Sequence, residues 1–335
     1  MRTLIAVLVI GVIAAGLSSA RGLNPAGVDA FIAEMVERHG FDRTRLDRLF
    51  RAVQPSSTVL AAISKPAETK PWYQYRELFL TRDRIDGGVD LWSRHRKTLA
   101  EVERRYGVPP EIVAGIIGVE TFYGRRTGDY SVLQALSTLA FEYPPRAAFF
   151  RAELEQMLLL TRERGIDPRT LRGSYAGAMG IPQFMPSSFR RYAADFEGDG
   201  RINIWGNPGD AIASVASYLA AHGWQSGAAI AVRARGIGKR YREFLFQGNQ
   251  PKSGLDELLR AGVVTERRLP GDPPALLVAL QGRGGRDEYW VVLNNFYVLT
   301  RYNRSASYAM AVYQLGEAVR NAYKTNVVSR VAKGP

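Results

Sequence analysis

One carboxylate stands at the end of an apolar helical stripe, and of all the side chains in this sequence it is the best candidate for a general acid. Val113, Ile116 and Ile117 precede Glu120 by seven, four and three residues, so all four lie on one face of a helix. Loss of hydration on such a face disfavours the ionised carboxylate and raises its pKa toward the working range of a general acid. The competing interpretation is a helix end that points into water, as most glutamates do.

The helix that positions Glu120 is expected to begin at Pro110. Proline is tolerated in the first turn because no N–H donor is needed there, and Glu111 follows where the helix dipole favours an anion. Glycines around Glu120 allow a neighbouring backbone or a ligand to come close. These glycines are Gly115, Gly118, Gly124 and Gly128.

A second stretch, GSYAGAMGIPQFMPSSF at residues 173–189, is too crowded with small residues and prolines for an ordinary helix or strand. Together with the segment Gly118-Val119-Glu120-Thr121 and Gly124, its residues 176–188 resemble the lytic murein transglycosylase B family. The resemblance extends from about residue 25 to about residue 322.

The resemblance implies a set of site residues. Glu120 would be the catalytic acid, and Ser174 and Gln183 match family positions that contact the sugar near the cleavage point. Polar side chains among glycines also serve to stabilise turns, which is the competing use for each of them. Further substrate contacts are expected from Tyr297, Tyr302, Asn303 and Arg146, with a solvated helix face as the alternative for the arginine.

A single good carboxylate limits the chemistry. Ordinary glycosidases use two carboxyl groups, and nothing marks Asp129 or Glu142 as the partner of Glu120. One acid is sufficient if the C6 hydroxyl of N-acetylmuramic acid attacks its own anomeric carbon, which gives the 1,6-anhydro product of the family that this sequence resembles. Two alternatives stay open: a muramidase of the goose-lysozyme kind, with water as nucleophile, and a non-catalytic wall-binding scaffold protein.

An acidic segment after residue 194 approximates the opening of a calcium-binding loop. Acidic residues alternate there, and Gly200 occupies the sixth position, where a sharp turn is needed. The twelfth position is Gly206 instead of a glutamate, but the resemblance implies a later aspartate in that role. A plain Asx and glycine turn is the alternative. The expected ligands of a structural Ca²⁺ are Asp195, Glu197, Asp199, Arg201 and Asp210, and no organic cofactor is expected.

The composition indicates an exported protein that binds a polyanion. The chain has 45 basic and 32 acidic residues among 335, a net charge of +13, and no cysteine, which excludes disulfides and a lipidated cysteine. Residues 1–20 have the charged start, apolar stretch and small-residue end of a cleaved signal peptide, with an uncleaved membrane anchor as the alternative. We therefore expect a periplasmic monomer whose partners are peptidoglycan glycan strands and cell-wall synthesis proteins. The absence of a nucleic-acid-binding signature argues against nucleic acid.

The predicted fold is mainly α, of the α+β class: a lysozyme-like core flanked by a helical N-terminal subdomain and a small α+β insertion. The expected divisions after the signal peptide are residues 21–105, 106–230, 231–290 and 291–335, the last completing the core. Residues 55–70 read as a loop, and 90–106 and 305–323 as helices. Strands are predicted at 229–232, 275–280, 289–293 and 297–300.

Overall fold

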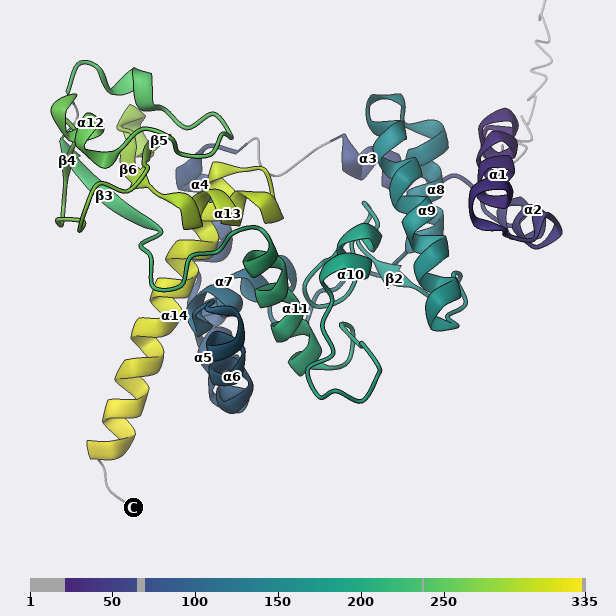
Figure 1. The fold of residues 1–335 in the computed structure, drawn as a ribbon, viewed down its shortest axis with the longest axis horizontal. Helices are drawn as coiled ribbons and strands as arrows, with labels where there is room; N and C mark the ends of the chain where they lie inside the picture. Colours follow the sequence, from purple (N-terminus) through teal and green to yellow (C-terminus); the bar gives the residue numbers. More distant parts are fainter. Residues whose placement is uncertain (1–21, 65–69, 237, 333–335) are drawn as a thin grey trace, which may run out of the picture.

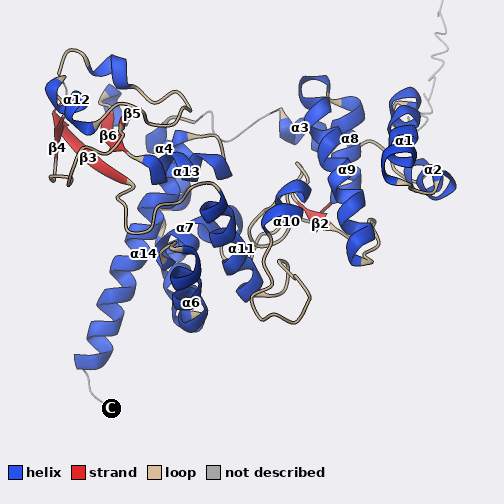
Figure 2. Ribbon diagram, in the orientation of Figure 1, coloured by secondary structure: helices blue, strands red, loops and turns tan. Residues whose placement is uncertain are grey.

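The computed structural model describes residues 22–64, 70–236 and 238–332, and it is mainly helical, with a small four-stranded sheet toward the C-terminal part (Figures 1 and 2). The predicted signal peptide lies outside the described residues. Among the helices that are described, none combines the length and the apolar character that crossing a bilayer requires.

The first helices pack on a later helical pair. Helices α1 (Pro25–His39), α2 (Arg43–Arg51) and α3 (Ser57–Ile63) meet α8 (Val132–Glu142) and α9 (Ala147–Arg164). Phe31 anchors this contact, because its ring lies 5.8 Å from that of Phe50 and 5.9 Å from that of Phe141. The prediction of a loop over 55–70 is wrong for α3, which forms because Ser56 caps it and Val59 is completely buried.

A second group of helices surrounds α7 (Pro110–Thr121), which carries Glu120. It consists of α4 (Trp72–Phe79), α5 (Arg82–Arg94), α6 (Arg96–Tyr106), α11 (Pro208–Ala221) and α14 (Ala306–Ala332). The helix predicted over 90–106 is therefore two helices that meet at His95, since α5 packs on α14 whereas α6 packs on α11. Thus residues 22–105 contribute to both helical groups, and the proposed domain boundaries stay a prediction.

The insertion contains a four-stranded antiparallel sheet in the order β4-β3-β6-β5. Its strands are β3 (Ala231–Gly236), β4 (Val264–Thr265), β5 (Leu276–Leu280) and β6 (Glu288–Val292), with helix α12 (Leu255–Arg260) and 3₁₀ turns η3 (Tyr241–Phe244) and η4 (Arg283–Gly285). Val232, Leu277 and Val291 belong to a separate apolar cluster on one face of this sheet. The sheet lies at one end of the molecule, and α1 and α2 lie at the other (Figure 1).

The remaining elements connect these groups: β1 (Tyr130–Ser131), paired with β2 (Arg172–Gly173), η2 (Pro144–Arg146), α10 (Pro186–Tyr192) and α13 (Asn294–Tyr302). The strand predicted at 297–300 is wrong, because these residues lie in α13. Their tyrosine, valine and threonine favour strands, but Phe296 and Leu299 are completely buried at helical spacing. Tertiary packing overrides the local preference.

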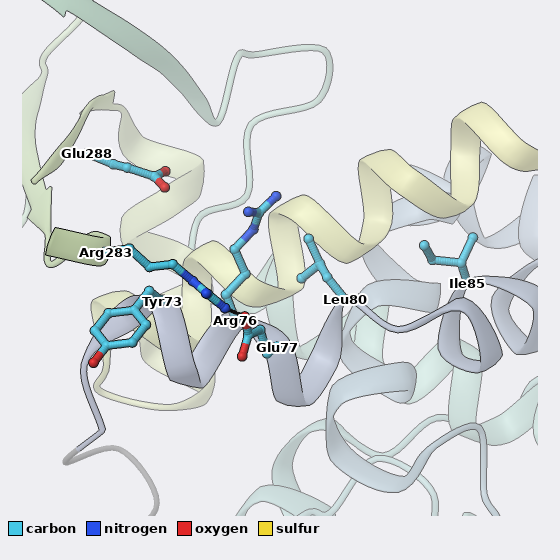
Figure 3. Close-up of a pocket in the computed structure, with 7 residues that line it drawn as sticks. All are labelled: Tyr73, Arg76, Glu77, Leu80, Ile85, Arg283 and Glu288. Atoms are coloured by element: carbon cyan, nitrogen blue, oxygen red, sulfur yellow. Dashed lines mark hydrogen bonds and ion pairs between the residues drawn. The ribbon is translucent and has the colours of Figure 1, made fainter. Parts of the chain in front are cut away.

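A cavity of about 450 Å³ marks where the insertion meets α4 (Figure 3). Arg283 of η4 forms an ion pair with Glu77 of α4, and the backbone N–H of Tyr73 donates to the Gln281 carbonyl oxygen at 3.2 Å. Both contacts hold the insertion against α4.

Candidate active site

Helix α7 is buried on nearly every side, which is more than the predicted amphipathic stripe. Val113, Ile116 and Ile117 are at most 1% exposed, as expected, but Ile112 and Val119 on other faces are buried too. A helix that is apolar all round belongs in the interior of a domain. Glu120 is the half-buried exception in the last turn of this helix.

Glycines bring α7 and α14 into close contact. A Cβ added at Gly115 would come within 2.5 Å of the Val312 carbonyl oxygen, and one at Gly316 within 2.6 Å of the Glu111 carbonyl oxygen. Only glycine permits this approach of two backbones. The prediction that Gly115 admits a neighbouring backbone is confirmed, and that neighbour is the C-terminal helix.

The close contact places a tyrosine of α14 against the candidate acid. The Tyr308 hydroxyl donates to the Glu120 carboxylate oxygen Oε1 at 2.5 Å, and Tyr308 is only 2% exposed. The ring of Tyr302 stacks nearly parallel to that of Tyr308, with centroids 6.4 Å apart. Burial, and then the charge of Glu120, raises the pKa of both phenols well above the ordinary value. Both tyrosines therefore stay neutral hydrogen-bond donors.

The chain directly after Glu120 follows an unusual path. Phe122 and Tyr123 have φ angles of 51° and 61°, which are left-handed and uncommon for aromatic residues. The surroundings hold this turn: the Thr121 hydroxyl accepts the Gly124 N–H at 3.0 Å, and the Arg84 guanidinium lies 4.9 Å from the Phe122 ring centroid. Arg84 also donates to the carbonyl oxygen of Gly118 in the last turn of α7.

The second conspicuous stretch of the sequence lies beside this turn. The Thr121 hydroxyl donates to the Ile181 carbonyl oxygen at 2.9 Å, and the Tyr302 hydroxyl donates to that of Pro182 at 2.6 Å. Gln183 follows with a left-handed φ of 51°. Within the described residues only Phe122, Tyr123 and Gln183 are non-glycine residues with positive φ, so backbone strain is concentrated around Glu120, as is common at functional sites.

The two polar residues predicted from this stretch have defined local partners. The Gln183 side-chain nitrogen donates to the carbonyl oxygens of Thr127 and Gly180 at 3.0 and 2.9 Å, which fixes the direction of the amide oxygen. The Ser174 hydroxyl oxygen accepts the backbone N–H groups of Ala176 and Ala178 at 3.3 and 3.1 Å. Ser174 thus stabilises its own turn, and its contact with substrate stays a prediction.

The other predicted substrate contacts belong to two separate elements, α13 and η2. Tyr297 shares α13 with Tyr302, and Asn303 ends that helix. Arg146 lies in η2, where its guanidinium is 4.4 Å from the ring centroid of Phe149. This stacking accounts for the conformation of Arg146 without a substrate.

The predicted calcium loop brings three carboxylates together. Ligand atoms of Asp195, Glu197 and Asp210 lie within 4.8 Å of one another, and Asp210 is 1% exposed. The donor set consists of oxygen atoms only, with Asp210 buried, Asp195 half-buried and Glu197 exposed, and such a set fits Ca²⁺. Asp199 is outside this group, and its carboxylate accepts the Arg201 N–H at 2.8 Å, as in the alternative Asx turn. The roles of Asp199 and Arg201 stay a prediction.

Sequence reasoning missed Tyr308 as a partner of Glu120. The signal in the sequence was that Tyr308, which has a polar hydroxyl, lies on the same buried face of α14 as Val312, Leu315 and Val319. A buried tyrosine hydroxyl requires a hydrogen-bond partner, but nothing local to α14 identifies which one. The same holds for Thr121, whose hydroxyl joins two distant segments.

A helical core built around a half-buried glutamate defines a lysozyme-like class of protein, and the comparisons with known proteins specify the family. Residues 24–317 match the family described as Transglycosylase SLT domain, and the chain belongs to it. It is 44% identical over 306 residues to the membrane-bound lytic murein transglycosylase B of Escherichia coli (strain K12), covering 88% of this chain and 83% of that protein.

Solved structures of relatives share the fold. The soluble lytic transglycosylase SltB1 of Pseudomonas aeruginosa is 52% identical, with a TM-score of 0.82 over 89% of this chain and 99% of that one. The Escherichia coli lytic transglycosylase Slt35, solved in complex with calcium, is 44% identical, with a TM-score of 0.81 over 90% of this chain and 94% of that one. SltB3 of Pseudomonas aeruginosa, in complex with NAG-NAM-pentapeptide, is 34% identical, with a TM-score of 0.77 over 87% and 78% of the two chains.

Proposed function

We propose that this protein is a periplasmic lytic transglycosylase, which cleaves the β-1,4 bond between N-acetylmuramic acid and N-acetylglucosamine in peptidoglycan without using water. The observation that carries the proposal is the half-buried Glu120, held by Tyr308 at the meeting point of three distant chain segments in a member of the SLT family. SltB3, a relative, has been solved with both NAG-NAM-pentapeptide and NAG-anhNAM-pentapeptide, and the second of these carries the anhydro end expected of a transglycosylase product.

Glu120 serves first as acid and then as base. Its carboxyl proton passes to the glycosidic oxygen as the bond to the anomeric carbon breaks, and N-acetylglucosamine leaves as an alcohol. The C6 hydroxyl of the muramyl unit then bonds to the anomeric carbon and gives its proton to the Glu120 carboxylate. The carboxyl group is thereby regenerated, and the intramolecular nucleophile benefits from a high effective molarity.

A second carboxylate is not needed for this route. Glu142, which is near Glu120 in the sequence, accepts the backbone N–H of Asn24 at 2.7 Å and so connects α8 to the start of α1. Gln183, Ser174, Tyr297, Tyr302 and Asn303 are proposed to contact the sugars on either side of the cleaved bond, and Arg146 to contact carboxylates of the polymer. The comparisons favour neither a hydrolytic muramidase nor a non-catalytic scaffold protein.

Calcium is proposed as a structural ion. Asp195, Glu197 and Asp210 would hold it, with Asp199 and the backbone oxygen of Arg201 as further ligands. Calcium in this loop would neutralise the gathered carboxylates and stiffen the segment before α11. Its chemistry is structural, and no step of the reaction depends on it.

The deciding experiment is digestion of purified murein sacculi with the full chain, followed by mass spectrometry. We expect muropeptides with anhydro ends, each lighter by one water molecule than a hydrolysis product. Glu120→Gln should lower the rate on the order of a thousandfold, because it removes the general acid. Glu142→Gln is the matched control and should retain activity. Reducing muramic ends, or undiminished turnover by Glu120→Gln, would refute the proposal.

A further inference from the structure

A second cavity lies between α2 and the end of α9, and it has no part in the proposed chemistry. Its volume is about 790 Å³, within the range of roughly 300–1,000 Å³ that is usual for ligand sites. The floor is apolar and includes Leu46 and Leu158. The cavity belongs to the end of the molecule opposite the sheet, where Figure 1 shows α2 well away from α7.

Arginines dominate the polar lining of this cavity. Arg45, Arg48, Arg162 and Arg169 line it together with two carboxylates, those of Asp42 and Asp167. Both carboxylates are already engaged: Asp42 accepts the N–H of Arg45 at 2.6 Å as the cap of α2, and Asp167 forms an ion pair with Arg169 at 2.6 Å.

Of these four arginines only Arg169 forms an ion pair among the described residues, so the other three keep uncompensated charge. Arg162 donates to the His39 carbonyl oxygen at 2.7 Å and lies 4.1 Å from the Phe41 ring centroid. Arg45 and Arg48 are exposed, and in the part of the chain that the structure describes neither guanidinium forms an ion pair. Arg45, Arg48 and Leu49 are spaced by three and four residues, so they share the face of α2 that lines the cavity.

We propose that this cavity is a second wall-binding site, which takes the carboxylates of murein peptide stems. The inference rests on the proposed function, because the substrate polymer itself supplies the ligand. Peptide stems combine several free carboxylates with the methyl groups of alanine, and these match the arginines and the apolar floor respectively. The glycan backbone has no free carboxylate where the lactyl group is joined to a stem, so the cavity distinguishes wall that carries peptide from bare glycan.

Because the cavity is remote from Glu120, its role is to anchor the enzyme on an insoluble polymer. Each anchoring contact raises the effective concentration of glycan at the catalytic glutamate. An acidic segment of another protein would meet the same arginines, but the wall presents many stems on every strand and is present wherever the enzyme acts.

The test is co-sedimentation of the full chain with sacculi, using Glu120→Gln as background so that the polymer survives. Adding Arg45→Glu and Arg48→Glu should weaken binding about tenfold, since two charge contacts are lost and reversed. Stem peptides released from other sacculi by an amidase should compete for the cavity: in excess they should weaken sacculus binding by the parent about tenfold and leave the binding of the doubly substituted variant unchanged.

The matched control is Arg43→Glu with Arg51→Glu, which makes the same change in net charge at two residues of α2 that do not line the cavity and should leave binding unchanged. Failure of the stem peptides to weaken sacculus binding by the parent, or an equal effect on the Arg45 and Arg48 variant, would overturn the proposal. Full binding of that variant to intact sacculi would do the same and would point to an acidic protein as the occupant.

The catalytic proposal is judged separately. With Glu120 present, the Arg45 and Arg48 variant should cleave soluble, stem-free glycan with unchanged kcat/KM. A protein that binds stems as expected but never cleaves glycan would refute the catalytic proposal and leave the wall-binding site intact.

Discussion

The candidate acid of this protein depends on a tyrosine for its position. Tyr308 is buried, it stays neutral because burial and the charge of Glu120 raise its pKa, and its hydroxyl therefore donates to the carboxylate throughout the working range. The hydrogen bond fixes the orientation of Glu120 and favours its ionised form. The Tyr302 ring stacks on that of Tyr308, and the Tyr302 hydroxyl donates to the Pro182 carbonyl oxygen.

Substitution Tyr308→Phe tests this positioning role. Loss of the donor destabilises the Glu120 carboxylate, so the alkaline limb of the pH profile of kcat/KM should move to higher pH. The loss of orientation should lower kcat about tenfold to a hundredfold. Both quantities can be measured by release of soluble anhydro-muropeptides from sacculi between pH 4 and 9.

Tyr218→Phe is the control for a general loss of packing. The Tyr218 ring also packs against that of Tyr302, but its hydroxyl donates to the Arg301 carbonyl oxygen at 2.6 Å and not to Glu120. A pH profile that shifts equally in both variants, or in neither, would show that Tyr308 is only a packing residue.

Among the secondary-structure elements, a buried glutamate joins α9 to α10 directly after the Gln183 segment. Glu153 is 6% exposed, and its carboxylate accepts the Ser187 backbone N–H at 2.9 Å and the Ser187 hydroxyl at 2.6 Å. Burial raises the pKa of Glu153 above its ordinary value of 4.5, and these hydrogen bonds only partly oppose the shift. The carboxylate thus caps the first turn of α10 at a cost in desolvation.

This raised pKa has a consequence for stability. Above the ordinary value of 4.5 the folded protein binds the Glu153 proton more tightly than the unfolded chain, so the free energy of unfolding falls as pH rises through the folded pKa. Glu153→Gln keeps an acceptor for the N–H and a donor for the hydroxyl, and it should be more stable than the parent by about 1 kcal/mol at pH 7 and by less at pH 4.5. Urea unfolding at the two pH values measures this, and an unchanged pH slope would contradict it.

A separate prediction concerns the effect of calcium on the acidic loop before α11. Calcium that binds only the folded chain should stabilise it by about 2.7 kcal/mol when its free concentration is a hundredfold above Kd, and a chelator should reverse this. Glu197→Gln should reduce the response. It should leave the calcium-free protein within about 0.5 kcal/mol of the parent, because Glu197 is exposed and glutamine keeps an acceptor for Asn207. Thermal unfolding with calcium, with magnesium and with chelator would show whether the loop is only an Asx turn.

For the molecule as a whole, the candidate catalytic centre is a junction of distant segments. Residues 118–124 contain the candidate acid, 181–183 lie beside it through Thr121, and α13 and α14 contribute Tyr302 and Tyr308. The arginine-lined cavity beside α2 is at another end of the molecule. The net charge of +13 favours the approach of both regions to an anionic wall.

Local signals explain what the sequence could predict. Asn24 caps α1, Gly40 and Gly165 end α1 and α9 in left-handed conformation, and the helix of Glu120 begins at Pro110 as expected. The errors occur where long-range packing decides. The β-prone residues 297–300 became helix, and the bond from Tyr308 to Glu120 joins elements that no local pattern relates.

The separation of that pair along the chain also sets the order in which the site can form. Glu120 and Tyr308 are 188 positions apart, and the helix that carries Tyr308 is the last one described. A growing polypeptide therefore contains its acid long before it contains the phenol that orients it. An enzyme that cuts the cell wall would thus gain its complete candidate site only after α14 has been made, and a chain that terminates before α14 lacks this site.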